Sequence, residues 1–173
     1  GFHESPEYRS TKERKYLEWS TRYAVKHCRK IITISEFTKR ELIRVYQADA
    51  SRIEVVSLGV SADYNTQSIG EEAIQTVLKK YSITQPYVLF LGRIDSRKNI
   101  ERLARAFEIA RNEAAFNGEL VLAGPLGFDS ASIVNKISQS SYTHSIRMIG
   151  WVSESDKQAL LHGSQMFVFP SLY

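Results

Sequence analysis

The chain is poor in cysteine and histidine and has no long apolar run. Cys28 is the single cysteine among 173 residues, which excludes an internal disulfide and is compatible with a reducing, cytoplasmic setting. The 4 histidines and Cys28 are not spaced as metal ligands, so we expect no zinc site. No apolar stretch approaches the roughly 20 residues that span a bilayer. The opening GFHESPEYRS also lacks the apolar region of a signal peptide.

Several well-known cofactor and catalytic motifs are absent as well. No G-x-G-x-x-G follows a predicted strand, which disfavours a dinucleotide fold of the dehydrogenase type. No G-x-x-x-x-G-K-[ST] is present, which excludes a P-loop nucleoside triphosphatase. No Ser-His-Asp set and no paired carboxylates stand out. Asp95 and Asp129 fall in candidate loops, where aspartate is most often a turn former.

Positive charge is concentrated in the N-terminal third. The net charge is +4, and residues 1–52 hold 12 Lys and Arg against 7 Asp and Glu, whereas the remainder holds 11 against 12. Such a segment can face phosphates, a membrane surface or nucleic acid, or it can form an ordinary solvated surface. We disfavour nucleic acid because no nucleic-acid-binding motif accompanies the charge.

The stretch YVLFLGRIDSRKN, residues 87–99, predicts a buried strand, a loop and the start of a helix. Five apolar residues stop at Gly92, which is typical of a parallel strand and lets a ligand approach the backbone. Asn99 is expected to cap the helix. A helix start past the carboxyl end of a strand favours anions. The loop also carries three cations, Arg93, Arg97 and Lys98. We therefore predict a phosphate site with two anchoring cations.

Strands and helices alternate from residue 87 onward, which predicts βαβ units and a parallel sheet. Strands are expected at 87–91, 119–123, 146–149 and 166–169. Helices are expected from residue 100, over 133–137, and after Ser153, which with Asp156 resembles a capping box. The strand ends carry three glycines, Gly92, Gly124 and Gly150, and Pro125 follows the second. Glycines at one edge of a sheet make a crevice that a ligand can approach closely.

The N-terminal third predicts two helices and two short strands. The first helix, 11–30, can pack on a domain core or lie near an anionic membrane, and its modest apolar face favours burial. Buried strands are expected at 31–34 and 53–57. Ser35 is interpreted as a helix cap or as part of an anion site. Gly59 can supply a positive φ or admit a ligand, and both residues are candidates for a cleft.

A polar connection separates the two halves of the pattern. The segment SADYNTQSIGEE is polar and contains Gly and Ser, a short helix is expected at 74–81, and Pro86 closes the segment. We predict a first domain over 1–60, a linker over 61–86 and a second domain over 87–173.

Six segments, in order, carry a resemblance to a known family. They are ITISEFTKREL, IEVVSLGV, YVLFLGRIDSRKN, LVLAGPLG, IGWVSESDKQAL and MFVFPSLY, and together they cover nearly the whole chain. They resemble the retaining GT-B glycosyltransferases of family four, which include bacterial mannosyltransferases. The resemblance implies an α/β fold of GT-B type with two Rossmann-like domains, both incomplete here. Residues 1–60 would end the acceptor domain, and 87–173 would form most of the nucleotide-sugar domain.

The resemblance also implies roles for named residues. Cations at Arg93 and Lys98 would hold the donor diphosphate, and they would stabilise the charge of the leaving group without a metal or other cofactor. Further pocket residues would be Gly92, Asn99, Gly124 and Pro125, with Gly150, Trp151 and Val152 near the base. The implied donor is a nucleotide sugar, GDP-mannose in preference to a UDP- or ADP-sugar. The implied acceptor is a glycan or a lipid-linked glycan.

Two features of the family are not found. The family has a His-Asp pair in its first domain, and GFHESPEY resembles the segment after that pair, so His3 is not its equivalent. Two glutamates seven residues apart would follow SLY, beyond Tyr173. We therefore expect no catalytic residue in this chain, which resembles an internal fragment of a longer enzyme and is expected not to transfer sugar alone.

Three functions remain open from the sequence. The first is a glycosyltransferase that moves a hexose, with mannose favoured, and retains the anomeric configuration. The second is a GT-B sugar-nucleotide epimerase, although the R-K-N loop favours the transferase. The third is a non-catalytic module that binds a nucleotide sugar or phosphate. A lipid-linked acceptor would place the protein in the cytoplasm or peripherally at the inner membrane face, with residues 9–30 as the candidate contact.

Overall fold

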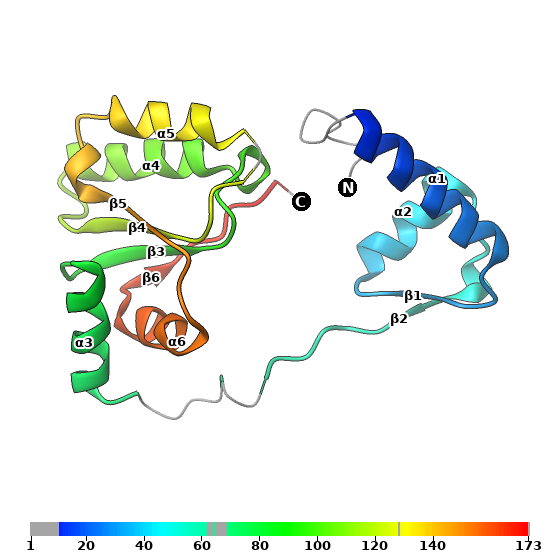
Figure 1. Cartoon of the computed structure of the whole chain (residues 1–173), viewed down its shortest axis with the longest axis horizontal. Helices are drawn as coiled ribbons and strands as arrows, with labels where there is room; N and C mark the ends of the chain where they lie inside the picture. The colour runs from blue at the N-terminus through cyan, green and yellow to red at the C-terminus, as the bar shows by residue number, and fades with distance from the viewer. Residues whose placement is uncertain (1–10, 62–63, 65–68, 128, 173) are drawn as a thin grey trace. The chain divides into compact units, whose positions relative to one another are not determined.

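The computed structural model describes residues 11–61, 64, 69–127 and 129–172. The chain divides into two compact units, residues 2–65 and residues 66–173. Each unit has helices beside a parallel sheet, of two strands in the first unit and of four strands in the second (Figure 1). The predicted α/β class is therefore confirmed.

The N-terminal unit pairs two helices with a short sheet. Its elements are α1 (Thr11–His27), β1 (Ile31–Thr33), α2 (Glu36–Tyr46), the short turn η2 (Ala50–Arg52) and β2 (Ile53–Val55). β1 and β2 are parallel. The Tyr46 hydroxyl of α2 donates to Glu18 Oε2 of α1 at 2.9 Å, and the Arg22 guanidinium lies 5.5 Å from the Tyr46 ring. Burial, together with the hydrogen bond to the Glu18 carboxylate, raises the pKa of Tyr46 to about 12.

The N-terminal third is less buried than we predicted, although Ile53 of β2 is buried as expected. α1 ends at His27 rather than at residue 30, and none of its residues is buried. In β1 only Thr33 is buried, and the side chain of Ile32 is 71% exposed. Among the described residues of this unit, α2 packs on both strands. A single helix layer covers one face of a sheet and leaves the apolar side chains of the other face in solvent.

The C-terminal unit is built on a four-stranded parallel sheet. Its strands are β3 (Tyr87–Leu91), β4 (Glu119–Ala123), β5 (Ile146–Gly150) and β6 (Met166–Phe167). They lie in the order β5-β4-β3-β6. All four strands were predicted, although β6 ends two residues earlier than expected.

Helices cover both faces of this sheet, with α4 (Ile100–Asn112) and α5 (Ser130–Ser138) on one side and α3 (Glu71–Tyr81) and α6 (Glu154–Gly163) on the other (Figure 1). Short turns η4 (Ser96–Lys98) and η5 (Thr143–Ser145) precede α4 and β5. Alternate strand residues point to opposite faces, so Phe90 and Leu122 pack with α4 and α5 while Leu89 and Val121 pack with α3 and α6. Burial on both faces explains the continuous apolar runs in the sequence.

α3 belongs to the C-terminal unit, although it lies inside the range 61–86 that we predicted as a linker. Ile74 and Leu78 of α3 are buried, which gives the helix an apolar face and fixes it against the sheet. Lys80 Nζ and the Tyr81 hydroxyl each donate to Asp156 Oδ2 of α6 at 2.7 Å. The connecting segment is therefore shorter than predicted.

Asp156 gives this α3–α6 contact a predictable pH dependence. Ser153 caps α6, as predicted, by accepting from the Asp156 N–H at 3.2 Å. Hydrogen bonds from Lys80 above all, and also from Tyr81 and Ser153, lower the pKa of Asp156 despite its burial. The resulting stabilisation is complete above the carboxyl pKa of the unfolded chain, about 3.9, and is lost as the pH falls through the lower folded-state pKa.

We predict that Asp156→Asn lowers the free energy of unfolding by about 1–2 kcal/mol at neutral pH, because charge-assisted hydrogen bonds are lost. In urea titrations, the difference between wild type and variant should shrink as the pH is lowered below about 4. Glu154→Gln on the same helix is the control, since its side chain is 61% exposed and its ion pair with Lys157 lies at the surface. A difference that is constant across this pH range would contradict the assignment.

Candidate functional site

The three predicted glycines meet at the carboxyl edge of the large sheet. Gly92 N donates to Ala123 O at 2.9 Å, and Gly124 N donates to Gly150 O at 2.7 Å. The ends of β3, β4 and β5 therefore lie side by side, and Figure 1 shows the loops that follow β3 and β4 at one edge of the unit. The sequence correctly predicted this edge.

The loops after β3 and β4 continue the parallel pairing beyond the strands. Ile94 N donates to Pro125 O at 2.9 Å, and Gly127 N donates to Ile94 O at 2.9 Å. Ile94 is buried, at 1% exposure, and forms an isolated parallel bridge with Leu126. The two loops are thus held together by backbone hydrogen bonds and not only by side chains.

Gly124 makes this close approach possible. A Cβ atom at position 124 would lie 1.9 Å from Gly92 O, and the residue has a φ of +144°. Both the contact and the backbone conformation exclude a side chain. Gly150 has a φ of +71° but faces open space, with no atom within 4 Å of a Cβ built there.

Asp95, rather than Asn99, organises the loop between β3 and α4. Asp95 is 8% exposed, and its Oδ1 accepts from Lys98 N at 3.2 Å, which forms the turn η4. Asn99 begins α4 with a φ of +59° and makes no side-chain capping bond, so the predicted capping role is wrong. The turn held by Asp95 ends in a left-handed residue, and asparagine tolerates that conformation.

Much of the backbone in this loop is already hydrogen-bonded. The N–H groups of Gly92, Ile94, Lys98 and Asn99 all donate to carbonyl oxygens within the unit. An anion at this loop would therefore depend strongly on side chains, of which Arg93 and Lys98 are the predicted pair.

Lys98 is fixed against an aromatic ring from the end of the unit. Its Nζ lies 4.3 Å from the centre of the Phe169 ring, and Phe169 stacks on Phe90 at 5.6 Å with an interplanar angle of 8°. Burial, and then the nearby Arg97 guanidinium, lower the pKa of Lys98, while the Asp95 carboxylate opposes the shift. Arg97 itself faces Asp95, with Nη2 and Oδ2 3.7 Å apart.

Arg93 is exposed, and its aliphatic stem lies over a glycine of the neighbouring loop. A Cβ atom at Gly127 would lie 2.7 Å from both Cγ and Cδ of Arg93, so the arginine stem passes directly over this glycine. Within the described part of the chain, the Arg93 guanidinium forms no ion pair. It therefore remains available to an external anion.

The other residues predicted for the nucleotide pocket differ in how far their side chains are exposed to a ligand. Pro125 is exposed, and Trp151 is 71% exposed at the end of β5. Val152 is 3% exposed and packs in the core on the α3–α6 side, so only its backbone can serve a ligand.

Two candidates for the cleft lie in the N-terminal unit and have simple local roles. Ser35 caps α2, since its Oγ accepts from Thr38 N at 3.2 Å. Gly59 does not have the positive φ that we considered, and nothing lies within 4 Å of a Cβ built on it.

Two residues of the site were missed from the sequence. Phe169, which supports Lys98, lies 71 positions away along the chain, and its signal was the FVFPSLY segment after the last strand. Gly127, which admits the Arg93 stem, is the second glycine of GPLG. Both act through contacts between separate loops.

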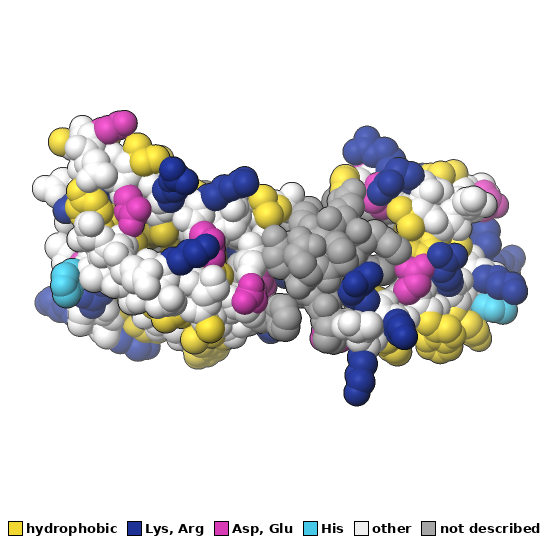
Figure 2. Space-filling model, turned by 90° about the horizontal axis from the view of Figure 1, so that it is seen from above, with side chains coloured by type: hydrophobic (Ala, Val, Ile, Leu, Met, Phe, Trp, Pro, Cys, Tyr) yellow, Lys and Arg dark blue, Asp and Glu magenta, His cyan; other side chains and the backbone are white. Residues whose placement is uncertain are grey.

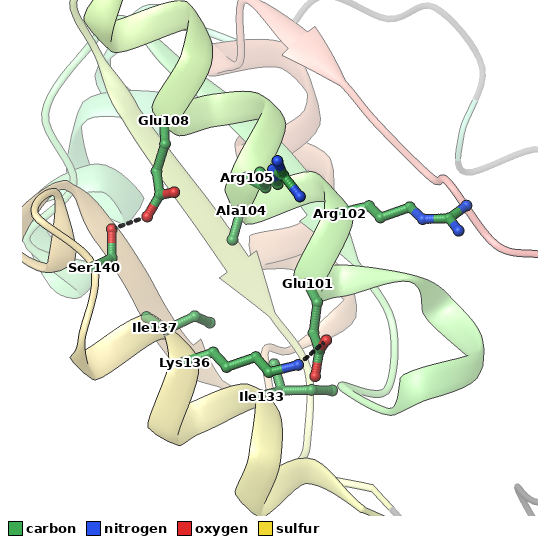
Figure 3. A pocket seen from close by; sticks show the side chains of 9 residues that line it. All are labelled: Glu101, Arg102, Ala104, Arg105, Glu108, Ile133, Lys136, Ile137 and Ser140. Atoms are coloured by element: carbon green, nitrogen blue, oxygen red, sulfur yellow. Dashed lines mark hydrogen bonds and ion pairs between the residues drawn. The ribbon is translucent and has the colours of Figure 1, made fainter.

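Two surface hollows lie elsewhere on the C-terminal unit. A groove of about 370 Å³ runs between α4 and α5, where Lys136 pairs with Glu101 and Ser140 donates to Glu108 (Figure 3). A second hollow of about 600 Å³ lies between α3 and α6. Neither is lined by a residue of the predicted site.

In the described part of the chain, no three His, Cys, Asp or Glu residues lie close enough together to bind a metal ion. No helix in that part has the length and hydropathy of a membrane span.

Comparison with known families identifies the chain. Residues 74–173 match the family described as Glycosyl transferases group 1, and residues 1–64 match Glycosyltransferase Family 4. The chain belongs to the glycosyl transferases group 1 family. The predicted family is thereby confirmed, and the two matches fall on the two compact units.

Curated relatives in this family include mannosyltransferases. O-antigen chain mannosyltransferase B of Escherichia coli is 31% identical over 169 residues, which cover 97% of this chain and 44% of the relative. Serotype-specific mannosyltransferase WbdA of Escherichia coli is 28% identical over 145 residues, which cover 83% of this chain and 18% of the relative. The chain thus spans less than half the length of these relatives.

Solved structures establish the fold of the family for this chain. Anabaena HepE in complex with UDP-glucose aligns with a TM-score of 0.77 and 16% identity, over 96% of this chain and 44% of HepE. A glycosyltransferase from Rickettsia africae ESF-5 aligns with a TM-score of 0.75 and 20% identity, over 88% of this chain and 41% of that one. The predicted GT-B type fold is confirmed.

Substitution of two of the edge glycines should separate steric clash from backbone strain. Gly124→Ala places a methyl group on Gly92 O and should lower the free energy of unfolding by about 3–5 kcal/mol. Gly150→Ala meets only the left-handed φ and should lower it by about 1–2 kcal/mol. Urea denaturation of the two variants provides the comparison. Equal losses would show that the Gly92–Gly124 contact does not hold the two loops together.

Proposed function

We propose that the C-terminal unit binds the diphosphate of a nucleotide sugar at the ends of β3 and β4, as the donor site of a glycosyltransferase. The observation that carries the proposal is the placement of Arg93 and Lys98 on one loop beside the glycine-lined edge. Within the described residues neither cation has a carboxylate in an ion pair, whereas Arg97 faces Asp95. Two cations without carboxylate partners on one loop suit a dianionic ligand.

The chemistry of sugar transfer explains why such cations are useful. When the glycosidic bond to the donor breaks, negative charge develops on the nucleoside diphosphate that leaves. Preorganised cations stabilise that charge in the transition state, because they need no reorientation during the reaction. Lys98 is held by Phe169, and the stem of Arg93 is positioned by its path over Gly127. We therefore propose that donor binding requires no metal or other cofactor.

We propose mannose as the sugar, GDP-mannose as the favoured donor, and a glycan or lipid-linked glycan as the acceptor. Support for mannose comes from the names of the relatives in Escherichia coli, which are mannosyltransferases. Support for a nucleotide-sugar donor comes from Anabaena HepE, whose solved complexes contain UDP, glucose and UDP-glucose. A UDP- or ADP-sugar is the alternative donor. Retention of the anomeric configuration is part of the same proposal.

Calorimetric titration of the 173-residue chain with GDP, UDP and ADP tests the site. Arg93→Ala and Lys98→Ala should each weaken diphosphate binding by about 10- to 100-fold, because each removes a charge-assisted hydrogen bond. Lys79→Ala is the matched control, since Lys79 is an exposed lysine in the last turn of α3, outside the proposed site. Unchanged affinity in both site variants would refute the site.

The same titration with intact donors tests the sugar separately. GDP-mannose should bind more tightly than UDP-glucose. Tighter binding of UDP-glucose, with the same sensitivity to Arg93→Ala, would keep the diphosphate site and overturn the choice of donor.

The lowered pKa of Lys98 predicts how diphosphate binding depends on pH. A bound dianion favours the charged ammonium, so binding raises the pKa of Lys98 and takes up a proton when the free lysine is partly neutral. Affinity should therefore fall as the pH rises through the lowered pKa of the free protein. In Lys98→Arg the guanidinium stays protonated, so this decline should be reduced. Identical pH profiles would show that Lys98 does not contact the phosphates.

A further inference from the structure

Lys98 has less freedom than an ordinary surface lysine. Figure 2 shows lysine and arginine side chains that stand out from the surface of the C-terminal unit into solvent. Lys98 is half-buried instead, its backbone N–H donates to Asp95 Oδ1, and its Nζ lies 4.3 Å from the centre of the Phe169 ring. A ring attracts an ammonium to its face through its quadrupole. Lys98 is therefore held at both ends, by the turn η4 and by the ring.

The Phe169 ring is itself anchored in the core. It stacks on Phe90 with ring centres 5.6 Å apart and an interplanar angle of 8°, and Phe90 has no exposed surface. Stacked rings attract each other beyond the burial of their area. Farther along the same segment, Leu172 N donates to Arg97 O at 3.2 Å. The segment that follows β6 is thus tied to the loop that carries Lys98, and the ring has a fixed position relative to that loop.

Gly92 leaves room for these two stacked rings. A Cβ atom at Gly92 would lie 3.2 Å from Cε2 of Phe169 and 3.3 Å from Cζ of Phe90. Carbon atoms prefer a separation of about 3.5–4.0 Å, so a side chain at this position would press against both rings. The φ of Gly92 is +152°, which also disfavours a side chain. The glycine that ends the apolar run of β3 therefore serves the placement of Phe169.

We infer that Phe169 is a positioning residue of the donor site, whose ring holds the Lys98 ammonium in place for the diphosphate. The inference rests on the proposed function and adds to it a residue from outside the cationic loop. The ring covers one side of the ammonium, which has three N–H donors and keeps its charge for a phosphate oxygen on another side. A lysine that is ordered before the ligand arrives loses less side-chain entropy on binding. Leucine at position 169 would be apolar as well, but it would not hold the ammonium.

Phe167 provides a matched control for a purely structural role of the ring. Phe167 and Phe169 are each 47% exposed, and they stack on each other with ring centres 6.2 Å apart. The ring that lies under the Lys98 ammonium is that of Phe169. Phe167→Leu therefore removes a ring of the same exposure from the same segment and leaves the contact with Lys98 in place.

NMR of the lysine side chains tests the contact without a ligand. In a chain labelled with ¹³C at the lysine ε-carbons, the signal of Lys98 is assigned by its absence from Lys98→Arg. The neighbouring ring should shift its ε-proton signal upfield. Phe169→Leu should remove this shift, whereas Phe169→Tyr and Phe167→Leu should retain it.

Calorimetry then tests the role in binding, with whichever of GDP, UDP and ADP binds the parent chain most tightly. Phe169→Leu should weaken binding by about 3- to 10-fold, because a long side chain must then be ordered by the ligand. Phe169→Tyr should restore the affinity, and Phe167→Leu should bind as the parent does. In a Lys98→Ala background, Phe169→Leu should have no further effect, because the ring acts through Lys98. Circular dichroism checks that each variant is folded.

Equal losses from Phe169→Leu with and without Lys98 would overturn the inference, since the ring would then act on the ligand or on the fold directly. An equal loss in Phe169→Tyr would also overturn it, and so would the absence of an upfield shift in the parent. A shift that is lost in Phe169→Leu while the affinity stays unchanged would reject the role of Phe169 and keep the donor site. Failure of the parent to bind all three diphosphates would instead refute the donor site, and the inference with it.

Discussion

The carbonyl oxygen of Gly92 occupies the space that a side chain at position 124 would need, and this backbone contact governs the geometry of the C-terminal unit. It lets the loops after β3 and β4 continue side by side past the sheet, with Ile94 buried between them. Arg93 then crosses Gly127 of the neighbouring loop at close range. The position of this cation thus depends on the absence of side chains at two glycines. A salt bridge cannot replace that contact, because no side chain fits at position 124.

Within the same loop, the Asp95 carboxylate and the Lys98 ammonium form no ion pair, although they lie only three residues apart along the chain. The Asp95 carboxylate is used by the N–H of Lys98 and faces the Arg97 guanidinium. The Lys98 ammonium turns instead to the Phe169 ring. A ring attracts a cation through its quadrupole but does not neutralise it, so Lys98 keeps its full charge for an incoming anion. Burial makes that charge less favourable in the empty site, and it lowers the pKa of Lys98 for the same reason.

The features that could be predicted from the sequence are those that depend on residues close together in the chain, such as strands and the glycines that end them. The apolar runs before Gly92 and Gly124 are long enough to identify strands buried on both faces, and the glycines mark where they end. The support of Lys98 by Phe169 could not be predicted, because it joins positions 71 residues apart. The left-handed conformation of Asn99 depends on the turn held by Asp95. The exposure of α1 could not be predicted either. The helical spacing of its apolar residues identifies a helix face, but it does not show which other element covers that face.

Both units place cations beside aromatic rings, and the difference in burial separates what each arrangement can recognise. Lys98 is half-buried against a ring that is itself stacked on Phe90, so the cation has a defined position and suits a ligand of defined geometry such as a diphosphate. On α1 the rings of Tyr16, Trp19 and Tyr23 are exposed, and the neighbouring Lys12 and Lys15 have long side chains with many rotamers. Mobile charges gain little from a small, directional ligand, because fixing each side chain costs entropy.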